Sequence, residues 1–240
     1  MSMNSFHAPP LTAFNKALLI LVSALFLLDS VLQLSFSFSL APYLGLSLTA
    51  IQSGWLTQLL TYPLLQTGLM GLLFNGLCLW FLGGELELTW GRKFYLKYIF
   101  ICYFFSGLIF LTINYFFFAG HLQASWPLLG LSGVTFSLLV AYGLLFSERY
   151  LSFMFLFPIK AKYFCLLLGA VEAYQAFFST FGRTSWAHLF SMMIGFLYLQ
   201  SPQLKQKIKS MGGQKKKRTR THLKIVDLEK GPDDKPRYWH

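Results

Sequence analysis

Long runs of apolar residues occupy most of this chain, and short polar or glycine- and proline-rich segments separate them. A helix that crosses about 30 Å of hydrocarbon needs roughly 20 such residues, and most of the runs approach or exceed that length. The pattern therefore predicts an all-α polytopic membrane protein with a bundle of six transmembrane helices. The predicted helices cover residues 14–36, 67–84, 93–118, 131–146, 162–180 and 185–200.

One apolar segment, residues 37–66, does not fit a spanning helix. It is rich in Leu and uncharged, but Pro42, Gly45, Gly54 and Pro63 interrupt it. It is too broken to span a bilayer and too apolar to lie in water. The segment is therefore expected to form short helices that lie in the outer membrane interface as a first loop.

Composition strengthens the membrane interpretation. Of the 240 residues, 55% are hydrophobic and only 12% are charged, whereas a soluble domain has about 25% charged residues. The missing polar surface must face lipid. We expect an N-terminal segment at 1–13, one membrane domain at 14–200 and a basic tail at 201–240.

Charge is distributed unevenly along the chain. Lys and Arg follow the second, fourth and sixth predicted helices, while the loops after the first and third helices carry no charged residue. Because cytoplasmic loops retain basic residues, both termini are predicted to be cytoplasmic. The net charge is +11, and twelve of the 20 Lys and Arg lie between Lys205 and Arg237. Such a tail beside apolar helices indicates contact with the lipid bilayer rather than with nucleic acid.

The first thirteen residues fit neither a cationic signal peptide nor an Arg-rich transit peptide. With a six-helix core, this favours a bacterial cytoplasmic membrane as the location. The three cysteines lie in apolar runs without CxxC spacing, so neither a disulfide framework nor a zinc site is suggested. No cofactor is expected.

Candidate chemistry lies at the start of the predicted helix 131–146, which reads Gly130-Leu131-Ser132-Gly133. At about 24 Å this helix is shorter than the hydrocarbon layer, so its start is expected below the outer surface. Backbone N–H groups are unpaired at a helix N-terminus and can stabilise an anion. Ser132 is therefore a candidate nucleophile.

His188 is the second candidate, because an imidazole within a membrane is costly and suggests a function. Both helices are predicted to run inward, and Ser132 and His188 both lie near the helix starts, so they share a depth. Small residues follow on each helix and would allow close packing: Gly133, Ser137 and Ala141 on one, Ala187, Ser191 and Gly195 on the other. The pair predicts a serine nucleophile with a histidine base.

Two carboxylates, Asp29 and Glu172, fall within predicted helices and should face the bundle or a water-filled cavity. Glu172 is expected to bond to Tyr or Ser on another helix. Neither carboxylate is assigned to catalysis, so the site is predicted to be a dyad rather than a triad.

In combination these motifs resemble the rhomboid family of intramembrane serine proteases over roughly residues 55–200. The stretch 130–133 is similar to the nucleophile motif, residues 187–195 to the Ala-His-x-x-Gly-x-x-x-Gly helix, and residues 72–75 with 83–91 to the second helix and the turn after it. The resemblance implies that Asn75 is an oxyanion donor and that Glu87 is structural. Gly71 departs from the family, which often has His there, and Gln66 also lies where His is frequent.

The resemblance implies an endopeptidase that cleaves a transmembrane segment of another membrane protein with Ser132 and His188. A second interpretation is a proteolytically inactive rhomboid-like protein that binds or escorts membrane helices, which the glycine at position 71 favours. A third, a small transporter, is disfavoured because internal repeats are absent from the sequence.

Overall fold

The computed structural model describes residues 11–118, 125–153, 157–179 and 182–201. The predicted basic tail lies outside these residues except for Ser201, as does most of the predicted N-terminal segment. Five of the predicted helices are confirmed to within three residues at each end: α1 (Ala13–Phe36), α7 (Arg92–Phe118), α8 (Ser132–Leu145), α9 (Ala161–Phe178) and α10 (Gly182–Gln200).

The second predicted helix is longer than the sequence indicates. It runs through α5 (Leu69–Cys78), a π-helical turn η2 (Leu79–Gly83) and α6 (Gly84–Trp90), so the predicted end at residue 84 is wrong. Both glycines of the pair 83–84 keep helical backbone angles. The run ends instead at Gly91, whose φ of 80° lies in the left-handed region that glycine adopts without strain.

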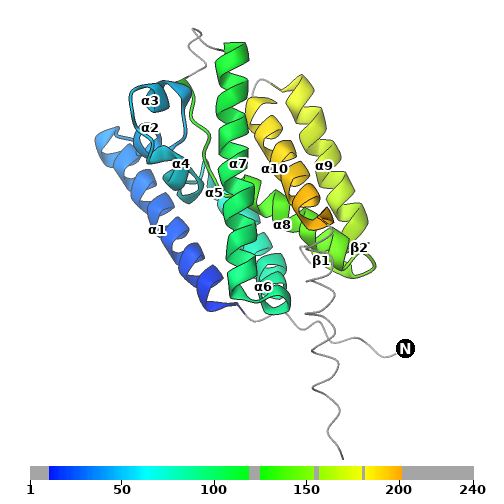
Figure 1. The fold of residues 1–240 in the computed structure, drawn as a ribbon. Helices are drawn as coiled ribbons and strands as arrows, with labels where there is room; N and C mark the ends of the chain where they lie inside the picture. Colours follow the sequence, from blue (N-terminus) through cyan, green and yellow to red (C-terminus); the bar gives the residue numbers. More distant parts are fainter. Residues whose placement is uncertain (1–10, 119–124, 154–156, 180–181, 202–240) are drawn as a thin grey trace, which may run out of the picture.

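The broken segment forms short helices, as predicted: α2 (Ala41–Leu44), α3 (Leu48–Gln52), α4 (Gln58–Thr61) and the 3-10 turn η1 (Tyr62–Leu64). They lie together near the end of α1 (Figure 1). The buried amide of Gln58 holds them, because its Oε1 accepts from the Ser47 N–H at 3.1 Å and its Nε2 donates to the Pro42 carbonyl at 2.8 Å. Their position in the membrane interface stays a prediction.

A small hairpin corrects the purely helical fold class. Strand β1 (Tyr150–Phe153) pairs antiparallel with β2 (Phe157–Lys160), and Tyr150 lies opposite Lys160. The sequence here is one continuous apolar run without alternating polar residues, so periodicity gives no strand signal.

Next to the hairpin, hydrogen bonds from Lys160 and Lys162 lower the pKa of the Glu148 carboxyl to about 2.

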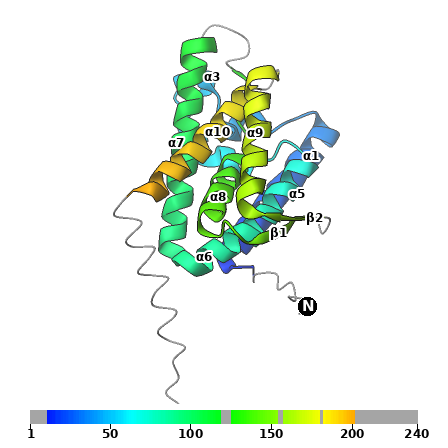
Figure 2. The same ribbon diagram turned by 90° about the vertical axis from the view of Figure 1, so that its right-hand side faces the viewer.

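The long helices alternate in direction. The run α5–α6, α8 and α10 point one way, and α1, α7 and α9 point the other way (Figure 1). Figure 2 shows α8 in the middle of the bundle, confined to the half near α6. Among the described residues, three helices are long and apolar enough to cross a membrane: Ala13–Phe36, Leu69–Trp90 and Arg92–Phe117. The molecule is thus a mostly helical membrane protein.

Small side chains let α10 pack closely against α7 and α8. The Ser191 hydroxyl donates to the Gly133 carbonyl at 2.6 Å, and the Ser106 hydroxyl of α7 donates to the Ala187 carbonyl at 2.8 Å. The Tyr98 hydroxyl fills the space beside Gly195 and donates to the Ser137 carbonyl at 2.6 Å. These contacts define the α8–α10 seam, which consists of Gly133 and Ser137 on α8 with Ala187, Ser191 and Gly195 on α10.

Replacing Gly195 by Ala should destabilise this seam. A Cβ at 195 would collide with the Tyr98 hydroxyl and lie 3.3 Å from Ser137 Cβ, and overpacking costs about 1–3 kcal/mol. Gly76→Ala is the matched control, because its Cβ would meet only Leu19 at an ordinary 3.5 Å and Ala favours a helix by about 1 kcal/mol.

The two substitutions should therefore shift the midpoint of thermal unfolding differently when both variants are measured in the same detergent. We expect a lower midpoint for Gly195→Ala and an unchanged or higher midpoint for Gly76→Ala. Equal midpoints for Gly195→Ala and the wild type would show that the seam is not tightly packed.

Candidate active site

The segment before Ser132 is held in place by the first loop. Leu46 and Leu128 exchange two backbone hydrogen bonds, at 3.0 and 2.8 Å, and the Gly130 N–H donates to the Tyr62 carbonyl at 3.0 Å. Gly130 has a φ of 98°, a left-handed conformation that other residues adopt only at a cost. This turn starts α8 directly at Ser132, at the recessed end of the helix.

Asn75 of α5 contacts Ser132 and is fixed by its own partners. Its Nδ2 donates to Ser132 Oγ at 3.3 Å, and its Oδ1 accepts from the Thr135 hydroxyl at 2.8 Å. Asn75 and Thr135 are each only 1% exposed. Asn75 therefore presents a buried amide donor at the serine, where a donor for an oxyanion is needed.

His188 of α10 is held by a carboxylate, which corrects the expectation that no carboxylate completes the site. Its Nδ1 lies 3.1 Å from Glu172 Oε2 of α9, and the two side chains are only 13% and 10% exposed. The Phe136 ring stacks on the imidazole with centroids 5.2 Å apart. The ring is thus fixed on one edge and one face.

The sequence contains a signal for this pairing. Residues 172 and 188 lie eight positions on either side of residue 180, so they face one another if the two predicted helices fold back antiparallel there. Phe136 is also predictable in principle, because it lies one helical turn after Ser132 on the same face. The predicted partner of Glu172 is instead Tyr or Ser, and the structure corrects this partner to His188. Phe136 is not among the predicted residues.

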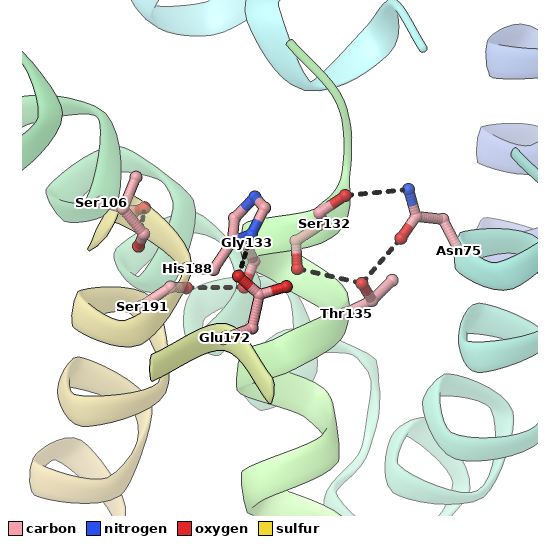
Figure 3. A network of polar contacts seen from close by, with 9 residues as sticks. Asn75, Ser106, Ser132, Gly133, Thr135, Glu172, His188 and Ser191 are labelled. Atoms are coloured by element: carbon pink, nitrogen blue, oxygen red, sulfur yellow. Dashed lines mark hydrogen bonds and ion pairs between the residues drawn. The ribbon is translucent and has the colours of Figure 1, made fainter. Parts of the chain in front are cut away.

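Ser132 lies between Asn75 on one side and His188 on the other (Figure 3). Among the described residues no hydrogen bond joins Ser132 to His188, because the serine hydroxyl faces the Asn75 amide. Catalytic hydrogen bonds often tighten only when substrate is bound. The structure thus brings the nucleophile candidate, the base candidate and the amide donor into one cluster.

The remaining predicted residues fall into two groups. Gly130, Gly133, Ala187, Ser191 and Gly195 form the turn before Ser132 and the α8–α10 seam. Glu87 lies away from the cluster in α6, where its Oε2 accepts from the Thr12 hydroxyl at 2.6 Å. This contact ties the start of α1 to α6, at the end of the bundle opposite the short helices of the first loop (Figure 1).

The cluster contains the groups that acyl transfer requires. Within the described ranges no group of three or more His, Cys, Asp or Glu side chains is arranged to hold a metal ion. A hydroxyl, an imidazole oriented by a carboxylate and a fixed amide donor are the groups that nucleophilic catalysis at a carbonyl requires.

Comparisons with known proteins agree with a membrane protein of rhomboid-like type. A family profile described as "Eukaryotic integral membrane protein (DUF1751)" matches residues 16–216. Rhomboid-like protein 19 of Arabidopsis thaliana is 28% identical over 194 residues, which cover 79% of this chain and 62% of that relative. The chain thus spans less than two thirds of the relative's length.

These matches correct one expectation. The profile describes eukaryotic proteins, so the predicted bacterial cytoplasmic membrane is wrong, while an integral membrane protein is confirmed. The relative's name supports the rhomboid-like resemblance but states no activity. The orientation of the termini stays a prediction.

A designed disulfide would test the packing beside the site without relying on activity. A Cβ at Gly133 would lie 3.7 Å from Ser191 Cβ, close to the mean of about 3.8 Å in disulfides. Gly133→Cys combined with Ser191→Cys should therefore form an intramolecular disulfide under mild oxidation, detected by peptide mass mapping under non-reducing conditions.

The matched control combines Gly133→Cys with Met193→Cys, because Met193 is 46% exposed on the outer face of α10. This pair should stay reduced. Equal oxidation of both pairs, or none at 133 and 191, would mean that the seam is not arranged as described.

Proposed function

Because the chain belongs to the eukaryotic integral membrane protein family (DUF1751), we propose a function within the bilayer: it is an intramembrane serine endopeptidase. In this proposal six helices span the membrane, and the substrate is a transmembrane segment of another membrane protein. The observation that carries the proposal is the position of Ser132, between the Asn75 amide and a His188 imidazole held by Glu172.

In the proposed reaction, Ser132 Oγ forms a bond to the scissile carbonyl carbon and its proton passes to His188 Nε2. The Nδ1–H donated to Glu172 leaves the lone pair on Nε2, which is the tautomer that a general base needs. The carbonyl oxygen becomes an oxyanion, which accepts a hydrogen bond from Asn75 Nδ2 and from backbone N–H groups at the start of α8.

When the tetrahedral intermediate collapses, the C–N bond breaks and His188 gives its proton to the leaving amine. A water molecule then attacks the acyl carbon while His188 accepts the water's proton. The bond between the acyl carbon and Ser132 Oγ breaks, the proton passes from His188 to Oγ, and the product leaves with a new carboxyl group. The recessed start of α8 favours this second step, because water can reach a half-buried serine from the outer side without crossing the whole bilayer. Glu172 acts as a positioning residue throughout.

An inactive rhomboid-like protein that binds membrane helices is the second candidate. Two observations favour it: Gly71 supplies no side-chain donor, and in the described residues Ser132 bonds to Asn75 rather than to His188. A binding role alone, however, gives no reason to hold His188 between a buried carboxylate and an aromatic ring.

A fluorophosphonate probe separates the two candidates, since it phosphonylates only an activated serine. We expect wild-type protein in native membranes to be labelled at Ser132, with no labelling of Ser132→Ala and a loss of at least about a hundredfold in His188→Ala. Because the probe forms its bond with Ser132 itself, the double variant should be unlabelled, as Ser132→Ala is.

Ser137→Ala is the control, because it removes a nearby serine hydroxyl on the same helix. Its labelling should match the wild type. If Ser132→Ala is labelled as rapidly as the wild type, the proposed nucleophile is wrong.

Glu172→Gln should slow phosphonylation even though the side chain keeps its shape. The amide can donate to His188 Nδ1 and so place the proton on Nε2, the wrong tautomer for a base. We expect a rate at least about tenfold lower and an altered pH profile, whereas Tyr174→Phe, on an exposed position of the same helix, should change neither. An unchanged pH profile in Glu172→Gln would exclude the positioning role.

A further inference from the structure

Gln66, just before α5, has a buried side-chain amide of which only the oxygen has a hydrogen-bond partner among the described residues. Its Oε1 accepts from Asn75 Nδ2 at 2.9 Å, and the residue is only 5% exposed. Its Nε2, in contrast, is buried and has no hydrogen-bond partner among the described residues. Leaving a buried donor without a partner costs free energy, because the donor has lost its hydrogen bonds to water, so such a group calls for an explanation.

A second glutamine nearby shows what a purely structural amide does. Gln58 of α4 is also fully buried, and both of its ends are paired with backbone groups of the first loop. Gln66 therefore differs from Gln58 in keeping a donor free, although both side chains come from the same loop region.

The free donor belongs to an amide beside the nucleophile. A Cβ at Gly130, two residues before Ser132, would lie 3.3 Å from Gln66 Oε1. A Cβ at Gly71 would lie 4.0 Å from the same atom. The Gln66 amide thus lies between the turn that carries Ser132 and the position where this chain lacks a side chain.

We propose that Gln66 is a second side-chain donor for the oxyanion, in the place that Gly71 leaves open. This inference rests on the proposed peptidase function and adds a catalytic residue to it. A carbonyl oxygen that gains negative charge beside Ser132 would accept hydrogen bonds from both Asn75 Nδ2 and Gln66 Nε2. Because Nε2 has no partner in the resting site, it need not break a bond to donate.

The alternative is that Gln66 only holds Asn75 in position. A double-mutant cycle distinguishes the two roles, because a residue that acts only through Asn75 has no effect once Asn75 is removed. The measured quantity is the second-order rate constant for fluorophosphonate labelling, since the tetrahedral phosphonyl oxygen occupies the oxyanion position. The variants are Gln66→Met, Asn75→Ala and the combination, in the full-length protein in membranes.

We expect Gln66→Met alone to lower the rate constant about a hundredfold relative to the wild type. The double variant should be at least about tenfold slower than Asn75→Ala. Gly71→His, which can restore a donor, should recover part of the rate in Gln66→Met. Gln66→Glu keeps the size of the side chain and the acceptor for Asn75 but removes the donor, so it should be as slow as Gln66→Met. It replaces Gln66→Met in the cycle if that variant does not fold.

The outcomes separate the two proposals. A labelled wild type with no further loss on adding Gln66→Met to Asn75→Ala would overturn the donor role and leave the peptidase proposal intact. A wild type that is not labelled at all would overturn both. Gln58→Met should affect thermal stability rather than the labelling rate of the folded protein, so it provides the structural comparison.

Discussion

The close approach of α8 and α10 is the constraint on which the rest of the site depends. The two helices approach closely because small residues line both sides of the seam, and the hydrogen bond from Ser191 to the Gly133 carbonyl fixes their register. Ser132 is the first residue of α8 and His188 lies in the second turn of α10, so the same register sets their relative depth. The tyrosine hydroxyl at position 98 fills the gap beside Gly195, so the seam has no room for a larger side chain.

Buried polar groups away from the seam follow a second constraint, since in a membrane they must find partners within the protein. Asp29, for example, accepts from the Leu40 N–H at 2.7 Å and from Gln33 Nε2 at 2.6 Å, and so ends α1 at the first loop. The Tyr95 hydroxyl donates to Asn15 Oδ1 at 2.9 Å near the other end of α1. Among the described residues, three buried side-chain donors have no partner: Asn15 Nδ2, Trp90 Nε1 and Gln66 Nε2. Of these three residues, Gln66 is the one that bonds to Asn75, the residue that contacts Ser132.

The sequence predicts the long helices well because each is a single apolar run with clear interruptions. It predicts poorly where geometry depends on neighbours: the π-helical turn at residues 79–83 and the hairpin at 150–160 have no periodic signal. For the site, Ser132 and His188 are found from local motifs and Asn75 from the rhomboid resemblance, and the structure brings the three together. Glu172 requires the fold-back of α9 onto α10, and the unpaired end of Gln66 is visible only when all its neighbours are placed.

Co-expression of the protein with a panel of single-span membrane proteins, comparing wild type with Ser132→Ala, tests whether the protein is a peptidase. We expect at least one panel member to be cut within or near its transmembrane segment by the wild type and to stay intact with Ser132→Ala. Equal cutting by both, or an uncut panel with well-folded wild type, would contradict a peptidase centred on Ser132; the uncut panel would favour a rhomboid-like protein that binds membrane helices without cleaving them.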